Sequence, residues 1–190
     1  MTRKEQKENR KKQILYKALE LFVIKGYSET KITDIATSLN ISVGLLFHYY
    51  KSKEQLYYEL IQIGVEGSEA TQKIEYKEPI QFFESFLKSL FATAVEQPWI
   101  YQMFVLMSQA QRPGIPKEIR KLALSVNQIE LSSKIIEQGQ KTGNIRKGDP
   151  MSLSIAFWCS VQGLMEKYAI SPEMELPEID WILDILKGEK

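Results

Sequence analysis

The sequence predicts an all-α fold of about nine helices, and three observations support this prediction. Apolar residues recur at the three- and four-residue spacing of amphipathic helices along most of the chain. No segment alternates apolar and polar residues like a half-buried strand, and no Asn-Gly or Asp-Gly pair marks a hairpin turn. Glycine, proline and serine residues separate the periodic segments, where helices are expected to begin and end.

The first predicted helix covers residues 4–25. Gly26 is a suitable residue to follow its last turn, because glycine accepts a left-handed backbone conformation. Residues 3–12 carry no apolar face, so we expect this stretch to be frayed until an anion binds. The apolar face of the remaining turns consists of Ile14, Leu15, Ala18, Leu19, Phe22 and Val23.

Two short helices joined by a tight turn are predicted next. Thr33 is the expected N-cap of the first short helix, and Asn40 accepts the left-handed conformation that a tight turn requires. Ile41 is expected to fill the turn, and Ser42 to cap the second short helix over residues 43–50. The inward-facing residues of the first short helix are Ile35, Ala36 and Leu39.

Six longer helices follow. The first begins at Ser52, with Gln55 completing a capping box, and ends near residue 73. The Asp149-Pro150 pair has the preferred order of an N-cap followed by a proline in the first turn. The other predicted helices are one that begins at Pro79 and four over residues 98–107, 116–141, 150–168 and 178–187.

Charge is distributed unevenly along the chain. Residues 1–54 hold 11 Lys or Arg and 6 Asp or Glu, a net charge of +5, whereas residues 55–190 hold 14 and 18, a net charge of −4. A basic N-terminal part on a mildly acidic body indicates a polyanionic partner for the basic part.

The residue inventory excludes several kinds of site. His48 and Cys159 are the only histidine and cysteine, whereas a zinc site built from these residue types needs three or four ligands. A Ser-His-Asp relay would have to use His48, and no glycine-rich phosphate-binding loop occurs. We therefore expect no enzyme, no cofactor and no metal. No apolar run approaches the ~20 residues of a membrane span, and a single cysteine suits a reducing compartment, so a cytoplasmic protein without membrane contact is expected.

The two short helices over residues 32–50 have the dimensions of a helix-turn-helix, whose second helix enters the major groove of DNA. Inward-facing residues at i, i+3 and i+7 of this second helix are Val43, Leu46 and Tyr50. The remaining positions then face outward: Ser42, Gly44, Leu45, Phe47, His48 and Tyr49. Exposed hydroxyls and rings suit contact with phosphates and thymine methyl groups. The helix contains no Arg or Lys, so bidentate recognition of guanine is not expected.

This region resembles the signature of the tetracycline-repressor (TetR) family. The resemblance rests on Gly26-Tyr27, Thr30, Ile32-Thr33-Asp34-Ile35-Ala36 and the run Leu39-Asn40-Ile41-Ser42-Val43-Gly44-Leu45-Leu46-Phe47-His48-Tyr49-Tyr50-Lys51-Ser52-Lys53-Glu54-Gln55-Leu56. It implies phosphate contacts for Thr33, His48, Tyr49 and Lys53, and positions at or near base edges for Ser42, Val43 and Leu45. Phe47 stands where the family often has tyrosine, so an apolar contact is implied, and Gly44 would let the helix approach DNA closely.

The resemblance also implies two domains, with DNA binding over residues 1–53 and effector binding and dimerisation over residues 54–190. The family dimerises mainly through its last two long helices, here residues 149–168 and 178–187. The expected interface residues are Leu153, Phe157, Val161, Leu164, Trp181, Ile182 and Ile185. A homodimer would match a palindromic operator in double-stranded DNA.

An effector pocket is predicted from aromatic and methionine residues at helical spacing. Its candidate residues are Phe86, Trp99, Tyr101, Met103, Phe104, Met107, Trp158, Gln162 and Met165. The resulting hypothesis is a repressor that leaves its operator when a largely apolar small molecule binds. Two alternatives stay open: a TetR-like protein whose body binds a protein partner in chromosome organisation or division, and a helical enzyme.

Overall fold

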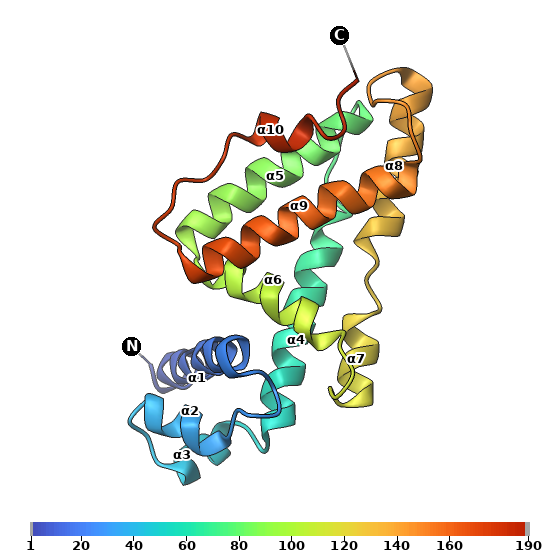
Figure 1. The fold of residues 1–190 in the computed structure, drawn as a ribbon. Helices are drawn as coiled ribbons and strands as arrows, with labels where there is room; N and C mark the ends of the chain where they lie inside the picture. The colour runs from blue at the N-terminus through green and yellow to red at the C-terminus, as the bar shows by residue number, and fades with distance from the viewer. Residues whose placement is uncertain (1, 189–190) are drawn as a thin grey trace. The chain divides into compact units, whose positions relative to one another are not determined.

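The computed structural model describes residues 2–188, and these residues form ten α-helices (Figure 1). The helices are α1 (Arg3–Lys25), α2 (Ile32–Ser38), α3 (Val43–Tyr49), α4 (Lys53–Thr71), α5 (Pro79–Glu96), α6 (Trp99–Ala110), α7 (Lys117–Ala123), α8 (Gln128–Thr142), α9 (Pro150–Ile170) and α10 (Ile179–Leu183). The predicted all-α fold is confirmed. No helix among residues 2–188 is long and apolar enough to cross a membrane.

The start of α1 differs from the prediction. Residues 3–12, expected to be frayed, are helical. Thr2 caps the helix, since its hydroxyl accepts from the Glu5 amide (3.2 Å) while the Glu5 carboxylate accepts from the Thr2 amide (2.7 Å). A capping box satisfies two backbone donors that a helix otherwise leaves unpaired. This local contact allows residues 3–12 to be helical although they carry no apolar face.

The helix predicted over residues 116–141 is divided into α7 and α8. After α7 the Ser125 hydroxyl donates to the carbonyl of Leu122 (2.7 Å), and the Asn127 side chain then accepts from the Glu130 amide (3.1 Å). Serine and asparagine form such local bonds in competition with helix continuation, so one helix ends and another begins here. Glu130 three residues after Asn127 is the sequence signal for this second start.

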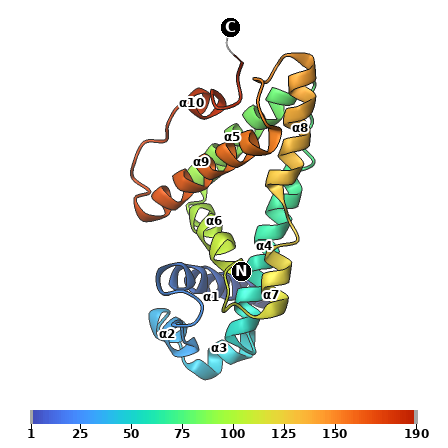
Figure 2. The ribbon, with the colours of Figure 1, turned by 45° about the vertical axis from the view of Figure 1, so that its right-hand side comes forward.

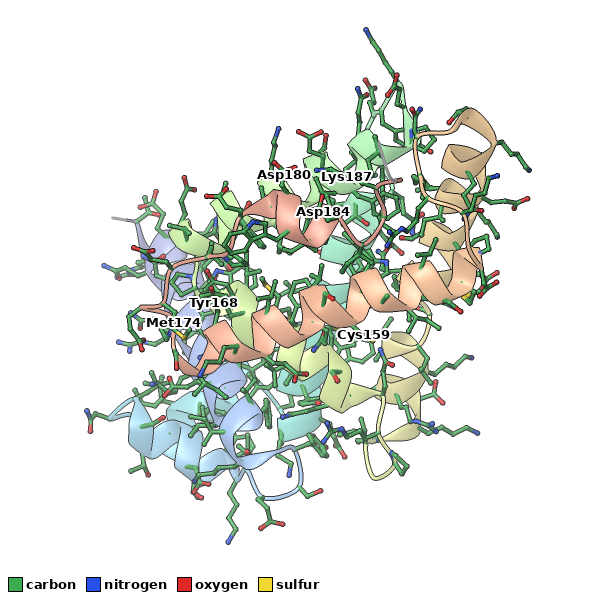
Figure 3. All side chains as sticks on the ribbon, turned by 45° about the horizontal axis from the view of Figure 1, so that its top comes forward. Cys159, Tyr168, Met174, Asp180, Asp184 and Lys187 are labelled. Atoms are coloured by element: carbon green, nitrogen blue, oxygen red, sulfur yellow. The ribbon has the colours of Figure 1, made fainter. Side chains whose placement is uncertain are left out.

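The last predicted helix, over residues 178–187, is also shorter than expected. Regular helix ends at Leu183, and the carbonyl of Leu186 accepts instead from the Arg146 amide (2.8 Å). Two ion pairs hold the end of the segment, from Lys187 Nζ to Asp180 (2.5 Å) and to Asp184 (3.4 Å) (Figure 3). The prediction that residues 178–187 form the second of two long final helices is therefore wrong, because α10 is only a short helix.

The chain folds as two compact units. Unit 1 comprises Met1–Val65 and Gln102–Ser125, and unit 2 comprises Glu66–Tyr101 and Val126–Lys190. Helices α4 and α6 have residues in both units. The predicted boundary after residue 53 separates a DNA-binding part from an effector-binding part by function and not by compactness, and it stays a prediction.

The core of unit 2 forms where α9 packs against α8 and where α10 packs against α5 and α9 (Figures 1 and 2). Small polar side chains hold the α8–α9 contact: the Ser154 hydroxyl donates to the Ile129 carbonyl (2.7 Å), and Trp158 Nε1 donates to Ser132 Oγ (2.9 Å). The aromatic part of this core consists of Phe82, Phe83, Phe86, Phe157 and Trp158.

Candidate nucleic-acid interface

Helices α2 and α3 are joined by the tight turn that the sequence predicted. Asn40 has a φ of 52°, the left-handed conformation, and its amide donates to the Thr37 carbonyl (3.0 Å). The Ile41 amide donates to the Ala36 carbonyl (3.0 Å), and Ser42 Oγ accepts from the Leu45 amide as the N-cap of α3 (3.1 Å). The dimensions are those of a helix-turn-helix.

Thr33 is not the N-cap of α2. Lys31 occupies that position, and Thr33 lies exposed in the first turn of the helix. The Asp34 carboxylate accepts from the Lys31 amide (3.4 Å) and pairs with Lys25 Nζ (2.9 Å). The Lys25 ammonium lowers the pKa of Asp34 below its usual range. The helix thus begins two residues earlier than predicted, and the Asp34 carboxylate accepts from the amide of the N-cap residue.

One side of α3 is buried and the other is exposed. Leu46 and the C-cap Tyr50 are fully buried, and Val43 is half-buried. On the opposite side Leu45 and Phe47 are 40% and 48% exposed, which is unusual for large apolar side chains. The other outward positions are Ser42, Gly44 and His48, which are exposed, and Tyr49, which is half-buried against the His48 ring.

The end of α3 is held by a polar network that sequence reasoning missed. The Tyr50 hydroxyl donates to Glu59 Oε1 of α4 (3.3 Å) and lies 3.5 Å from the Lys11 carbonyl of α1. Lys11 Nζ in turn pairs with both Glu59 carboxylate oxygens (3.2 and 3.3 Å). Burial, followed by the Glu59 charge, raises the pKa of Tyr50. Nothing in the sequence links Lys11 with Glu59, because they are 48 residues apart.

The ammonium of Lys53, an expected phosphate ligand, already has partners within unit 1. Its Nζ donates to the carbonyls of Tyr27 (2.7 Å) and Ser28 (3.3 Å), and lies 4.3 Å from the centre of the Tyr27 ring. Burial, with the nearby Glu54 charge, raises the pKa of Tyr27 to about 12. An ammonium has three N–H donors, so these two bonds leave one for a phosphate.

The predicted pocket residues are divided between the two units. Met103, Phe104 and Met107 belong to unit 1, and the other six belong to unit 2. In unit 2 the Phe86 and Trp158 rings are 4.9 Å apart, Met165 is fully buried, and Tyr101 lies 5.6 Å from Tyr168. Gln162 Nε2 donates to the half-buried Glu166 carboxylate (2.8 Å) and Trp99 Nε1 to Gln97 Oε1 (3.2 Å).

The predicted dimer surface needs correction. Phe157, Val161 and Ile182 are buried in the core of unit 2, because the protomer's own helices cover them, so they cannot form a surface for a partner. Leu153, Leu164 and Ile185 are half-buried, and Trp181 is 68% exposed. The exposed side of α9 instead presents Met151, Ile155, Ala156, Cys159 and Gly163 (Figure 3 labels Cys159).

Comparisons with known proteins agree with this geometry. Residues 14–60 match the model of bacterial regulatory proteins of the tetR family. The uncharacterized HTH-type transcriptional regulator YhgD of Bacillus subtilis (strain 168) is 30% identical over 148 residues, which are 75% of this chain and 75% of YhgD.

Two solved structures share the fold. The MbdR regulator from Azoarcus sp. CIB is 19% identical with a TM-score of 0.75, over 92% of this chain and 95% of MbdR. AibR in complex with isovaleryl coenzyme A and operator DNA is 20% identical with a TM-score of 0.71, over 92% of this chain and 94% of AibR. The matched family model, the identity to YhgD and the helix-turn-helix at α2–α3 together show that the chain belongs to the TetR family of bacterial transcriptional regulators.

Proposed function

We propose that this regulator represses transcription as a homodimer bound to a palindromic operator, and that a largely apolar small molecule releases it. The observation that carries the proposal is the exposed side of α3. Leu45 and Phe47 stand outward on a short helix whose opposite side is fixed by the buried Leu46 and Tyr50. A rigidly held helix with exposed apolar side chains suits contact with thymine methyl groups in the major groove.

Each exposed position has a proposed role. Ser42, Val43 and Leu45 contact base edges, Phe47 makes an apolar contact, and Gly44 permits close approach. Phosphates are bound by Thr33, His48, Tyr49 and the remaining N–H of Lys53. Because α3 carries no Arg or Lys, we propose that specificity also depends on DNA shape.

The effector is proposed to bind among the aromatic residues of unit 2. The Phe86, Trp158 and Tyr101 rings provide apolar surface, and Gln162 provides a polar group. AibR, which shares the fold, is solved with an acyl coenzyme A and operator DNA, and this supports an effector that acts on DNA binding. A differential affinity of about 1–3 kcal/mol would change operator binding roughly 5- to 150-fold. We propose that α4, which has residues in both units, transmits the change.

The first experiment is selection from a random duplex pool at about 150 mM salt, where binding that depends on phosphate contacts alone is weakened. Enrichment of a palindrome with half-site centres about 10 bp or a multiple apart would support a dimeric, sequence-specific regulator. Binding without any enriched sequence would contradict the proposal.

A pair of variants then tests the role of α3. Phe47→Ala is expected to lower affinity for the selected operator by about 5- to 150-fold without loss of helicity, because burying such an apolar side chain contributes about 1–3 kcal/mol. Tyr58→Ala is the control, because Tyr58 on α4 is 40% exposed and lies outside the helix-turn-helix. Equal losses in both variants would show that Phe47 has no special contact with DNA.

The proposal assigns the chain no catalytic role, so turnover of a bound effector would contradict it. Because the proposed partner is chromosomal DNA, the proposal also locates the protein in the cytoplasm.

A further inference from the structure

The first turns of α1 carry a stripe of positive charge. Successive residues of an α-helix are about 100° apart around its axis, so five cations fall within an arc of roughly 120°. They are Arg3, Lys4, Lys7, Arg10 and Lys11, which we call the α1 stripe. The capping box at Thr2 and Glu5 keeps this part of the chain helical, so the cations are aligned and not dispersed on a coil.

The α1 stripe lies on the same side of the helix as the residues that later turns of α1 bury. Ile14, Ala18 and Phe22, which lie in the core of unit 1, fall in nearly the same arc. At Lys11 the stripe contacts other elements of unit 1. Lys11 Nζ pairs with Glu59 of α4, and the Lys11 carbonyl lies next to the hydroxyl of Tyr50. The stripe therefore starts beside the C-terminal end of α3 and extends about 12 Å beyond it along α1.

The other four cations of the stripe are not neutralised within the described residues 2–188. Arg3, Lys4 and Lys7 are exposed, Arg10 is half-exposed, and no ion pair among the described side chains involves any of them. The Glu5 carboxylate already accepts a hydrogen bond from the Thr2 amide in the helix cap. Glu8 lies roughly 40° beyond the edge of the arc, where its charge acts on Tyr50, and it offsets part of the positive charge.

Exposed lysines on other helices of this chain differ from those of the α1 stripe in having acidic partners. Exposed lysines of α5 and α8 pair with a glutamate four residues away: Lys88 with Glu84, Lys134 with Glu130, and Lys141 with Glu137. Such pairs stabilise a surface helix by a few tenths of a kcal/mol. The α1 stripe lacks such pairs, although Glu5 and Glu8 are present on the same turns, so the charge of its four cations other than Lys11 is available to an external anion.

We propose that the α1 stripe binds the phosphate backbone of the DNA that α3 contacts, which extends the protein's footprint beyond the helix-turn-helix. The inference rests on the proposed function for its partner. Lysine and arginine side chains along one line suit a phosphate backbone, and they contribute affinity without sequence preference. The hydroxyl of Tyr50, the C-cap of α3, lies 3.5 Å from the Lys11 carbonyl, and this proximity places the stripe next to the proposed interface within unit 1.

The test compares two lysines on the same helix. Lys7 lies in the stripe, whereas Lys12 lies outside the arc at an angle of roughly 80° from its nearest edge. Lys7→Ala and Lys12→Ala remove the same charge and the same side chain. Binding to the selected operator and to a random duplex is measured between about 50 and about 200 mM salt, and helicity is checked by circular dichroism.

Each lost phosphate contact should reduce the slope of log K against log salt by about 0.9, which is about 1.8 for a dimer. The advantage of the wild-type protein over Lys7→Ala should then shrink about tenfold between 50 and 200 mM salt. Lys12→Ala should keep the wild-type slope, and Lys7→Arg should restore it. Equal slopes for wild type and Lys7→Ala, or equal losses in Lys7→Ala and Lys12→Ala, would overturn the proposal.

The two proposals fail separately in this design. If the wild-type protein selects no sequence, the proposed function fails, while the slopes on the random duplex still decide whether the stripe binds phosphates. If a palindrome is selected but Lys7→Ala behaves as wild type on both duplexes, the stripe has no role and the proposed function stands.

Discussion

At the scale of single residues, the phenol of Tyr57 lies fully buried in unit 1. Its ring packs 4.9 Å from that of Phe22 and 4.8 Å from that of Tyr27. Its hydroxyl has no hydrogen-bond partner among the described residues. A buried polar group without a partner costs about 1–3 kcal/mol. The aromatic ring therefore stabilises the unit, whereas its hydroxyl destabilises it.

We predict that Tyr57→Phe raises the free energy of unfolding at pH 7 by about 1 kcal/mol, because the ring contacts remain and the unpaired hydroxyl is removed. Urea unfolding measures the change. Tyr58→Phe is the control, since the adjacent Tyr58 is 40% exposed, and it should change stability by less than about 0.5 kcal/mol. A loss of stability in Tyr57→Phe would mean that the hydroxyl has a partner such as a buried water.

The same variant tests the alkaline limit of stability. Burial raises the pKa of Tyr57 in the folded state, whereas an unfolded tyrosine has a pKa of about 10. Above pH 10 the unfolded chain loses the proton first, so stability is complete below that pH and falls as the pH rises. Each tyrosine whose pKa is raised by folding lowers the free energy of unfolding by up to about 1.4 kcal/mol per pH unit in this range. Tyr57→Phe should therefore lose less stability than Tyr58→Phe between pH 10 and 11.

At the scale of elements, helix α4 contains two glycines in different surroundings. A Cβ added at Gly64 would overlap Met107 Sδ and lie 2.8 Å from Met107 Cγ and 3.3 Å from Met103 Sδ of α6. A Cβ added at Gly67 would meet nothing within 4 Å. Glycine inside a helix costs about 1 kcal/mol relative to alanine, so close packing explains the first glycine and not the second.

We predict that Gly67→Ala stabilises the protein by about 1 kcal/mol, because it only raises helix propensity. Gly64→Ala gains the same propensity but must displace Met107, and overpacking costs about 1–3 kcal/mol. Thermal or urea unfolding should therefore rank Gly67→Ala above wild type and Gly64→Ala at or below it. Combining Gly64→Ala with Met107→Ala should make the Gly64→Ala step favourable, and its failure to do so would exclude the steric explanation.

At the scale of the whole molecule, the exposed side of α9 is the best candidate for the two-fold interface. Met151 and Ile155 are 40% and 44% exposed there, and small residues such as Ala156 and Gly163 permit close approach of a second helix. On α10 the Trp181 side chain is 68% exposed. Exposed large apolar side chains such as Met151 and Ile155 on one side of a helix are typical of an association site.

We predict that Ile155→Glu converts the protein from a dimer to a monomer, because an isologous interface would bury the unpaired charge twice, once in each subunit. Light scattering after size-exclusion chromatography should change from twice the chain mass of 22.0 kDa to that mass. Ile24→Glu on α1 is the matched control, since Ile24 is 71% exposed, and it should stay dimeric. A dimeric Ile155→Glu protein would move the interface away from this side of α9.

The sequence by itself determined the features that depend on neighbours in the chain. The left-handed Asn40, the cap at Ser42 and the outward Leu45 and Phe47 follow from residue types within one or two turns, so the helix-turn-helix was predictable. The cap at Asn127 was predictable in the same way, although the break between α7 and α8 was missed.

Only the tertiary structure decided the contacts between residues far apart in the chain. The partners of Lys53 lie 25 and 26 residues away, and Glu59 lies 48 residues from Lys11. Helix α9 is apolar around most of its circumference, so no periodicity indicates which side the protomer buries and which it leaves to a partner. Local hydrogen bonds and capping are encoded within a few residues, whereas burial and ion pairing depend on which helices pack together, and that is a property of the complete fold.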